Sequence, residues 1–240
     1  MPRHEVYIEA FWGRGTIARK KRLAAITIGI DPDPVAISDG SARALMFQGC
    51  GVEWLKGYFT LTSSDEGYCV EDLAAGLSGA DVAASTFGGY SWNRHFVYLD
   101  PPYIGCQGRG YYRHELTDEQ HADLCRVFLA LPCPAALSGY RSDVYDAELH
   151  GTRSINYQTV NRAGKVVTEY LWMNYDEPVR YHDTRYVGSG RRERERIRRR
   201  VKTWSNGLLH MKPAERQAVW EECQRVYERA RASESSGATR

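Results

Sequence analysis

The sequence lacks the features that mark several large classes of protein. It contains no run of about 18 apolar residues, which a membrane-spanning helix needs, and no charged-then-apolar leader at its N-terminus. Its six cysteines include no Cys-x-x-Cys pair, and no Cys/His cluster has the spacing of a zinc site. We therefore expect neither membrane insertion nor secretion, no metal site, and reduced thiols in a cytosolic compartment.

The sequence also lacks a marked excess of charge of either sign. Among its 240 residues, 32 are Lys or Arg and 30 are Asp or Glu, which gives a formal net charge of +2. That balance by itself gives no indication of a nucleic-acid partner. Hydrophobic residues make up 42% and charged residues 26%, values typical of a soluble globular protein, so collagen-like and wholly disordered chains are excluded.

Charge is nevertheless distributed unevenly along the chain. Residues 191–202 contain seven Arg and one Lys against two Glu, a net charge of +6, so the remaining residues are acidic as a group. This run favours a phosphate-binding surface, a solvated helix face or a helix that pairs with another subunit. A second helix is expected to begin at Pro213, and small polar residues from Ala232 predict a disordered tail.

The first two thirds of the chain alternate short apolar runs with helical patterns. Such alternation is typical of a buried parallel sheet covered by helices. The apolar runs expected to form strands are residues 6–8, 24–30, 68–70, 96–99 and 135–137. The clearest helix is expected at residues 117–131, where Thr117 and Gln120 have the spacing of a capping box.

The pattern changes after residue 150. Residues 152–158 and 166–173 alternate in the manner of strands, and a Gly-containing loop lies between them. The sheet is therefore expected to end in an antiparallel pair. We expect three segments along the chain: an α/β domain over residues 1–183, an Arg-rich helical extension over residues 184–231, and the tail over residues 232–240.

Several expected strands end in glycines or acids, and in an open parallel sheet ligands bind beyond the carboxyl ends of the strands. Gly13 and Gly15 follow the first strand, where a Gly-x-Gly turn lets the backbone approach a ligand. Asp31 ends the second strand and can accept hydrogen bonds from ribose hydroxyls. Asp72 follows the third run and can accept a hydrogen bond from an amino group. Taken alone, each of these also fits a plain turn or a helix cap.

The fourth strand end is more specific, because it reads Asp100-Pro101-Pro102-Tyr103. Two prolines fix an extended turn that has no backbone N–H donors. The turn therefore places an acceptor carboxylate, the acceptor carbonyl of Pro101 and an aromatic face together. This set suits a flat substrate that bears an amino group.

These motifs together resemble the Dam-type DNA adenine methyltransferases. The resemblance rests on the order Phe-x-Gly-x-Gly at residues 11–15, then Asp31, then Asp-Pro-Pro-Tyr at residues 100–103. Residues 112–119, 137–140 and 169–174 look like small phage- and prophage-type members of that family, as does the Arg-rich segment, so the resemblance spans roughly residues 5–225. It implies a Rossmann-like class I methyltransferase fold and S-adenosylmethionine as the cofactor.

The resemblance also implies a role for each motif residue. Tyr103 would stack on a target adenine flipped out of the duplex, while Asp100 and the Pro101 carbonyl would accept hydrogen bonds from its exocyclic amine. Asp31 would hold the ribose hydroxyls of the cofactor, and Asp72 would hold its adenine. Trp12 and Arg14 depart from the small residues that are commoner at these positions in the family, and we expect them to crowd or clamp the cofactor. The residues implied on the methionine side of the cofactor are Glu9, Phe11, Gly13 and Gly15.

Two further departures from that family concern the start of the chain and the reading of DNA. It begins almost on the first strand, without the preceding Gly-Gly-Lys segment that helps to hold the cofactor in other members. Only 27 residues separate Asp72 from Asp100, too few for the target-recognition domain that larger members carry there. We therefore expect an incomplete cofactor site or a truncated start, and a short or relaxed DNA recognition sequence.

DNA contacts are expected from two segments of the chain. The residues expected to contact DNA around the flipped base are Arg109, Tyr111, Tyr112 and Arg113. Those expected to bind phosphate, in a sequence-independent and salt-sensitive way, are Arg191, Arg192, Arg198, Arg199 and Arg200. The expected activity is methyl transfer to the adenine amine in DNA. The alternatives are adenine methylation in RNA, and a catalytically weakened relative that only binds nucleic acid.

Overall fold

The structure is a computed structural model, and it describes residues 1–39, 44–62, 91–105, 108, 110, 112–161 and 164–237. The chain divides into two units, Met1–Asp183 and Thr184–Arg240.

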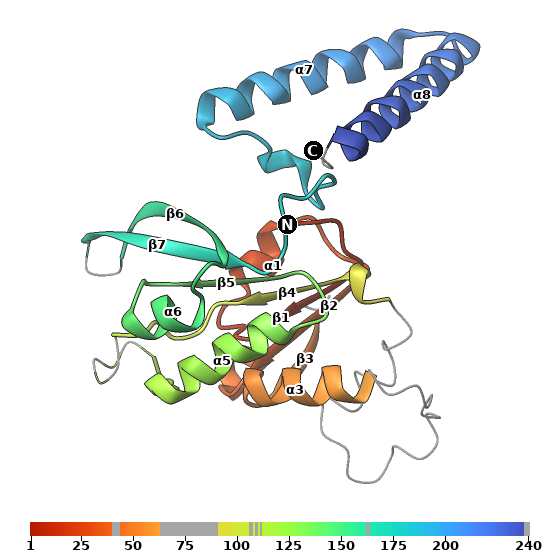
Figure 1. Cartoon of the computed structure of the whole chain (residues 1–240). Helices are drawn as coiled ribbons and strands as arrows, with labels where there is room; N and C mark the ends of the chain where they lie inside the picture. Colours follow the sequence, from red (N-terminus) through yellow and green to blue (C-terminus); the bar gives the residue numbers. More distant parts are fainter. Residues whose placement is uncertain are drawn as a thin grey trace, which may run out of the picture. The chain divides into compact units, whose positions relative to one another are not determined.

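The first unit is built on a sheet with seven strands among the described residues, in the order β3-β2-β1-β4-β5-β7-β6 (Figure 1). The strands are β1 (Val6–Glu9), β2 (Ile26–Asp31), β3 (Leu45–Gln48), β4 (His95–Leu99), β5 (Ala135–Gly139), β6 (Arg153–Val160) and β7 (Val166–Met173). Strands β1 to β5 are parallel, and β7 runs antiparallel between β5 and β6. This arrangement is that of the Rossmann-like class I methyltransferase fold, so the expected fold class is confirmed.

Most of the expected strands are present in the sheet. The apolar runs at residues 6–8, 24–30, 96–99 and 135–137 correspond to β1, β2, β4 and β5, and the expected hairpin forms β6 and β7. The sequence did not predict β3, a short strand at the edge of the sheet whose Leu45 is 43% exposed. The run at residues 68–70, expected as the third strand, lies outside the described residues.

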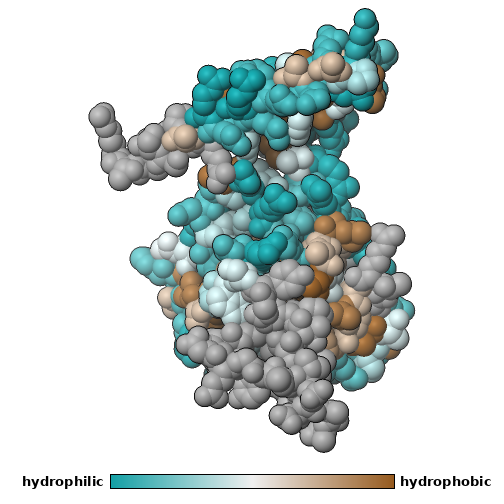
Figure 2. Space-filling model, turned by 90° about the vertical axis from the view of Figure 1, so that its right-hand side faces the viewer, coloured by the Kyte–Doolittle hydropathy of each residue, from teal (hydrophilic) through white to brown (hydrophobic). Residues whose placement is uncertain are grey.

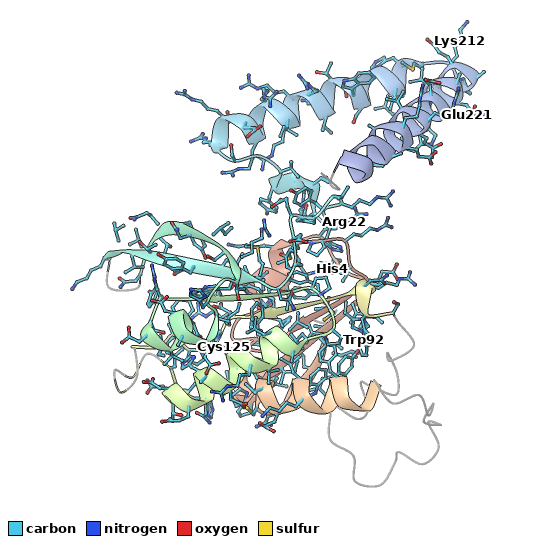
Figure 3. The ribbon with its side chains drawn as sticks, viewed as in Figure 1. His4, Arg22, Trp92, Cys125, Lys212 and Glu221 are labelled. Atoms are coloured by element: carbon cyan, nitrogen blue, oxygen red, sulfur yellow. The ribbon has the colours of Figure 1, made fainter. Side chains whose placement is uncertain are left out.

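Helices cover both faces of the sheet (Figure 1). One face packs against α3 (Gly51–Thr62), α5 (Asp118–Ala130) and α6 (Asp143–Glu148), with fully buried Leu55, Leu124 and Phe128. Cys125 lies on the buried side of α5 (Figure 3). The other face packs against the short helices α1 (Thr16–Lys20) and α2 (Pro34–Ser38).

The α5 helix begins as its sequence predicts. The Thr117 hydroxyl accepts a hydrogen bond from the Gln120 backbone at 3.3 Å, and the Gln120 side chain accepts one from the Thr117 backbone at 2.9 Å. The expected capping box is therefore confirmed. It fixes the start of the helix that covers β4 and β5, the strands that lead into the candidate site.

The first residues of the chain pair with the last residues of the first unit. Pro2 bridges Tyr181, the His182 backbone N–H donates to the Met1 carbonyl at 3.1 Å, and the His4 and His182 rings stack with centroids 3.7 Å apart. His182 also contacts the carbonyl of Arg22 through its Nε2 at 2.9 Å; His4 and Arg22 are labelled in Figure 3. These contacts join segments at the two ends of the unit.

The second unit is helical, with a 3-10 turn at Thr184–Tyr186 followed by α7 (Arg191–His210) and α8 (Pro213–Gly237). The second helix begins at Pro213 as predicted. It continues to Gly237, so the structure has helix where a disordered tail was expected from Ala232, because the Ala, Ser and Glu residues there tolerate helical backbone.

Apolar side chains on both helices of the second unit are exposed, among them Trp204 at 60% and Trp220 at 57%. The face shown in Figure 2 is mainly hydrophilic over this unit, with a few apolar side chains among the charged ones. No described helix is long and apolar enough to cross a membrane.

Candidate functional site

The topology of the sheet defines where a ligand would bind. Strands β1 and β4 are neighbours, but the chain leaves β1 toward β2 on one side and leaves β4 toward β5 on the other. At such a switch point the connections diverge and leave a crevice beyond the carboxyl ends of the two strands. Glu9 ends β1 and Asp100 follows β4, so two acidic side chains come to this one place.

The turn after β1 is shaped by a buried tryptophan. Gly13 and Gly15 have backbone φ angles of 49° and 58°, which residues other than glycine rarely adopt. A Cβ on Gly15 or on Gly29 would lie 2.4 Å from the Trp12 ring, so both glycines make room for the indole. Trp12 is only 2% exposed and therefore lies beneath the turn, where it packs in the core rather than on its outer surface.

Asp31 joins the end of β2 to this turn. One carboxylate oxygen accepts a hydrogen bond from the Gly13 backbone N–H at 2.8 Å, and the other accepts one from the Asp33 N–H at 2.9 Å. Asp33 in turn caps α2 and forms an ion pair with Arg113 at 3.0 Å. Each Asp31 oxygen keeps a lone pair for a further donor, and the side chain is only half-buried.

Glu9 is buried at the end of β1. Its Oε2 accepts hydrogen bonds from the Tyr7 hydroxyl at 2.9 Å and from the Ala18 backbone N–H at 3.1 Å. Burial raises the pKa of Glu9 to about 7, the two hydrogen bonds oppose that rise, and the charge of Asp100 adds to it. The carboxyl group therefore changes its protonation state near neutral pH.

Asp100 is held by the strand beside it. Leu99 of β4 lies opposite Leu137 of β5, so the next residues along the two strands, Asp100 and Ser138, are also neighbours. The Ser138 hydroxyl donates to Asp100 Oδ1 at 2.7 Å. Burial raises the pKa of Asp100, whereas hydrogen bonds from Ser138 and Tyr103 lower it.

Tyr103 completes the Asp-Pro-Pro-Tyr turn. Its ring meets the Tyr140 ring edge to face, with centroids 4.6 Å apart and an interplanar angle of 69°. Burial and the nearby charge of Asp100 raise the pKa of the Tyr103 hydroxyl, so that hydroxyl stays neutral. Pro101 is buried and Pro102 is half-buried between the carboxylate and the ring. The structure therefore brings the four turn residues together at one strand end.

The other expected site residues are distributed between the units or fall outside the described part. Asp72, Arg109 and Tyr111 lie outside the described residues. Phe11 packs at the edge of the core, Tyr112 is half-buried, and Arg113 is exposed beside Asp33. The predicted phosphate-binding residues Arg191, Arg192, Arg198, Arg199 and Arg200 are all exposed on α7 of the second unit.

Acidic residues on α7 pair with part of its basic charge. Glu195 pairs with Arg191 at 3.1 Å and with Arg199 at 4.0 Å, and Glu193 pairs with Arg196 at 3.2 Å. Exposed pairs of this kind are weak and leave the helix strongly basic. Within the part of the chain that the structure describes, no group of three or more His, Cys, Asp or Glu side chains could hold a metal ion.

Two residues of the site carried no assigned role in the sequence. Ser138 and Tyr140 belong to a segment that supports the family resemblance, yet a serine in an apolar strand gives no indication of its partner. The close packing at Gly29 could have been predicted from the sequence, because a glycine inside a strand often marks a place where other atoms approach closely. At Gly29 those atoms belong to the ring of Trp12.

Comparisons with known proteins concern the fold. No protein-family model and no curated protein matches the chain. Similar solved structures include an rRNA methylase from Streptococcus thermophilus, at 10% identity and a TM-score of 0.38, with 72% of this chain and 87% of that chain covered. A SAM-dependent methyltransferase from Agrobacterium tumefaciens has 10% identity, coverages of 72% and 56%, and a TM-score of 0.40. Precorrin 8w decarboxylase from Methanobacterium thermoautotrophicum has 11% identity, coverages of 72% and 82%, and a TM-score of 0.36.

Proposed function

We propose that this chain transfers a methyl group from S-adenosylmethionine to the exocyclic amino nitrogen of adenine in DNA, with a short or relaxed recognition sequence. The observation that supports this most strongly is the Asp100 turn. A carboxylate held by Ser138 stands at the switch point of the sheet and is followed by two prolines and an aromatic ring. This arrangement offers acceptors and a stacking surface to a flat amine.

The residues present fit the ribose end of S-adenosylmethionine. Asp31 is half-buried at the carboxyl end of β2, and both of its oxygens have lone pairs left after their backbone hydrogen bonds. The space above Gly13 is open, because an added Cβ there would meet nothing within 4 Å. Glu9 lies on the methionine side in this proposal. When bound, the cofactor supplies an electrophilic methyl group attached to a positively charged sulfur.

The chain itself contributes acceptors for the amine. The lone pair of the adenine amino nitrogen is delocalised into the ring, so the nitrogen is a poor nucleophile. Hydrogen bonds from its two protons to the Asp100 carboxylate and to the Pro101 carbonyl favour a pyramidal nitrogen and stabilise the positive charge that develops on it. Tyr103 would stack on the flipped base and fix its orientation, which contributes through positioning.

In this proposal, arginine side chains supply the affinity for DNA. Arg113, together with Tyr112 and the residues between 104 and 113, would contact DNA around the flipped base. The exposed α7 arginines would bind phosphates, an interaction that does not depend on base sequence. We expect a short or relaxed recognition sequence, because the 27 residues between Asp72 and Asp100 leave no room for a separate target-recognition domain. Phosphate contacts position a protein without reading bases.

The test is methyl incorporation from radiolabelled S-adenosylmethionine into matched duplex DNA, single-stranded DNA and RNA. We expect incorporation into DNA, and its loss by at least 100-fold in Asp100→Asn, which keeps the shape of the side chain but removes its charge. The matched control is Asp146→Asn, a surface acid paired with Arg141, which should leave transfer unchanged.

Two outcomes would contradict the proposal. Incorporation into RNA alone would establish the alternative substrate. Equal incorporation by the wild-type protein and Asp100→Asn would exclude the proposed chemistry. Sequencing of the modified DNA would test relaxed specificity, which a strict recognition motif would refute.

A further inference from the structure

A buried chain of hydroxyl groups leads to Asp100. Ser138 lies in β5 and is 1% exposed, and Tyr98 lies in β4 and is 8% exposed. The Tyr98 hydroxyl is 3.1 Å from Ser138 Oγ, and Ser138 Oγ is 2.7 Å from Asp100 Oδ1. Ser138 Oγ also lies 3.2 Å from the Leu99 carbonyl, a longer and therefore weaker contact.

The direction of these hydrogen bonds is fixed when Asp100 is ionised. An ionised carboxylate has no proton to give, so Ser138 must be the donor to Asp100. The single proton of the serine hydroxyl is then used, and Tyr98 must be the donor to Ser138. The distance of 2.7 Å suits such a charge-assisted bond.

Burying a hydroxyl at position 138 costs free energy, and packing alone gives no reason for it to be there. The surrounding β5 residues are apolar and buried, and an alanine would fill the same strand position without a polar group to satisfy. A buried hydroxyl costs free energy unless its hydrogen bonds are made. Here its contacts are with the end of β4, with the acid that follows it and with Tyr103 of the same turn.

We propose that Ser138, oriented by the Tyr98 hydroxyl, is a positioning residue that keeps Asp100 ionised and aimed as an acceptor for the substrate's amino group. This inference rests on the proposed function. Because the Ser138 hydroxyl donates to Asp100 Oδ1, it restricts rotation of the carboxylate. The position of the second oxygen, Oδ2, is therefore set before the substrate binds. Because the bond is donated to the charged form, it offsets the burial that favours the neutral acid.

Other ionisable groups lie around Asp100 and affect its pKa. Glu169 of β7 disfavours the ionised form through its charge, and Tyr103 favours that form through a hydrogen bond. The remaining groups whose titration is coupled to the charge of Asp100 are Tyr7 and Glu9 of β1, Tyr98 of β4, Tyr145 of α6 and Tyr157 of β6. Glu9 changes its protonation state near neutral pH, so its contribution has to be separated from that of Asp100.

The experiment uses the full chain with Ser138→Ala, Ser138→Thr and Tyr98→Phe, and Ser154→Ala on the exposed side of β6 as a matched control. Two quantities are measured. The first is the pH profile of methyl transfer into duplex DNA, recorded also in a Glu9→Gln background. The second is the pH titration of the Asp100 carboxyl carbon by carbon-13 NMR, assigned with Asp100→Asn.

We expect Ser138→Ala to move the Asp100 titration and the acidic limb of the rate profile to higher pH, so that transfer falls about tenfold at the acidic end and recovers as the pH rises. Ser138→Thr keeps the hydroxyl and should restore most of the wild-type profile. Tyr98→Phe should produce a smaller shift in the same direction, and Ser154→Ala none.

An Asp100 titration that Ser138→Ala leaves unchanged would overturn the inference, as would a loss of transfer that is uniform across pH. A wild-type protein that transfers no methyl group would refute the proposed function instead. The NMR titration would still decide whether Ser138 stabilises the ionised form, so the two failures are distinguishable.

Discussion

The two carboxyl groups at adjacent strand ends, Asp100 and Glu9, are in similar surroundings, because burial raises the pKa of each and two hydrogen bonds oppose that rise. Asp100 receives hydrogen bonds from the side chains of Ser138 and Tyr103, which favour its ionised form. Glu9 is buried, and its two donors do not fully offset the desolvation of its charge. For Glu9 the result is a carboxyl group that can gain or lose a proton near neutral pH.

Glu9 should make the stability of the first unit depend on pH. Its pKa is about 7 in the folded chain against 4.5 as the reference value, so between these limits the folded state binds more protons than the unfolded state. Stability from this group is therefore fully present below pH 4.5 and is lost as the pH rises through about 7. The whole effect amounts to about 3 kcal/mol in the unfolding free energy.

Urea unfolding of the wild-type chain and Glu9→Gln at pH 5 and pH 8 measures this effect. The variant should gain stability relative to the wild type on going to pH 8, because it has no charge to bury. A difference between the two proteins that stays constant with pH would contradict the prediction. A matched control is Glu5→Gln, at a partly exposed acid that precedes β1 and pairs with Arg94.

At the scale of the element, β2 and the turn after β1 are coupled through Trp12. Gly29→Ala would place a Cβ 2.4 Å from the ring and 2.8 Å from the Met46 side chain. Overpacking of this kind costs about 1–3 kcal/mol. Gly49→Ala is the control, because an added Cβ there meets nothing within 4 Å.

Chemical denaturation of Gly29→Ala, Gly49→Ala, Trp12→Phe and the double variant Gly29→Ala with Trp12→Phe measures this coupling. The smaller phenylalanine ring should recover part of the stability that Gly29→Ala removes. A double variant destabilised by the sum of the two single effects would show that the ring does not contact the added methyl group.

The sequence predicted those elements whose signals are local. The capping box of α5 and the strand pattern of β4 depend on residues within one segment, and both form as predicted. β3 is a four-residue strand at the edge of the sheet with little burial, and its three apolar residues, Leu45, Met46 and Phe47, show no alternation. An apolar run this short cannot be told from part of a helix by its pattern alone. Its presence depends on pairing with β2, which is a tertiary effect.

The same distinction applies to the candidate site. Asp100, Asp31 and the glycine turn could be predicted because each is a motif that follows its own strand. The contact between Asp100 and Ser138 could not, since it depends on the register between β4 and β5. The burial of Trp12 likewise depends on two glycines from different elements.

At the scale of the whole molecule, most of the concentrated positive charge lies in the second unit, whereas the candidate site lies in the first. We predict that replacing Arg198, Arg199 and Arg200 by Gln weakens DNA binding equally for all sequences. The slope of log affinity against log salt should become shallower by about 0.9 for each phosphate that these arginines no longer neutralise. The matched control replaces Arg216, Arg225 and Arg229 of α8 by Gln and removes the same charge.

Binding titrations at several salt concentrations decide this prediction. An equal weakening in both triple variants would indicate a general effect of net charge. A slope that the α7 variant leaves unchanged would show that these arginines do not bind phosphate. Their exposed positions would then fit a solvated or subunit-pairing helix.

The pairing of residues 1–4 with residues 180–182 has a consequence for how the protein is made. Contacts between such distant positions are among the slowest to form, because a long loop must close before they contribute. During synthesis the first strand emerges early, while the partner of its leading segment emerges only after β7. The first unit therefore completes its fold only after β7 and residues 180–182 have been made, and until then the buried faces of His4 and Phe96, whose rings stack in the finished unit, are open to incorrect partners.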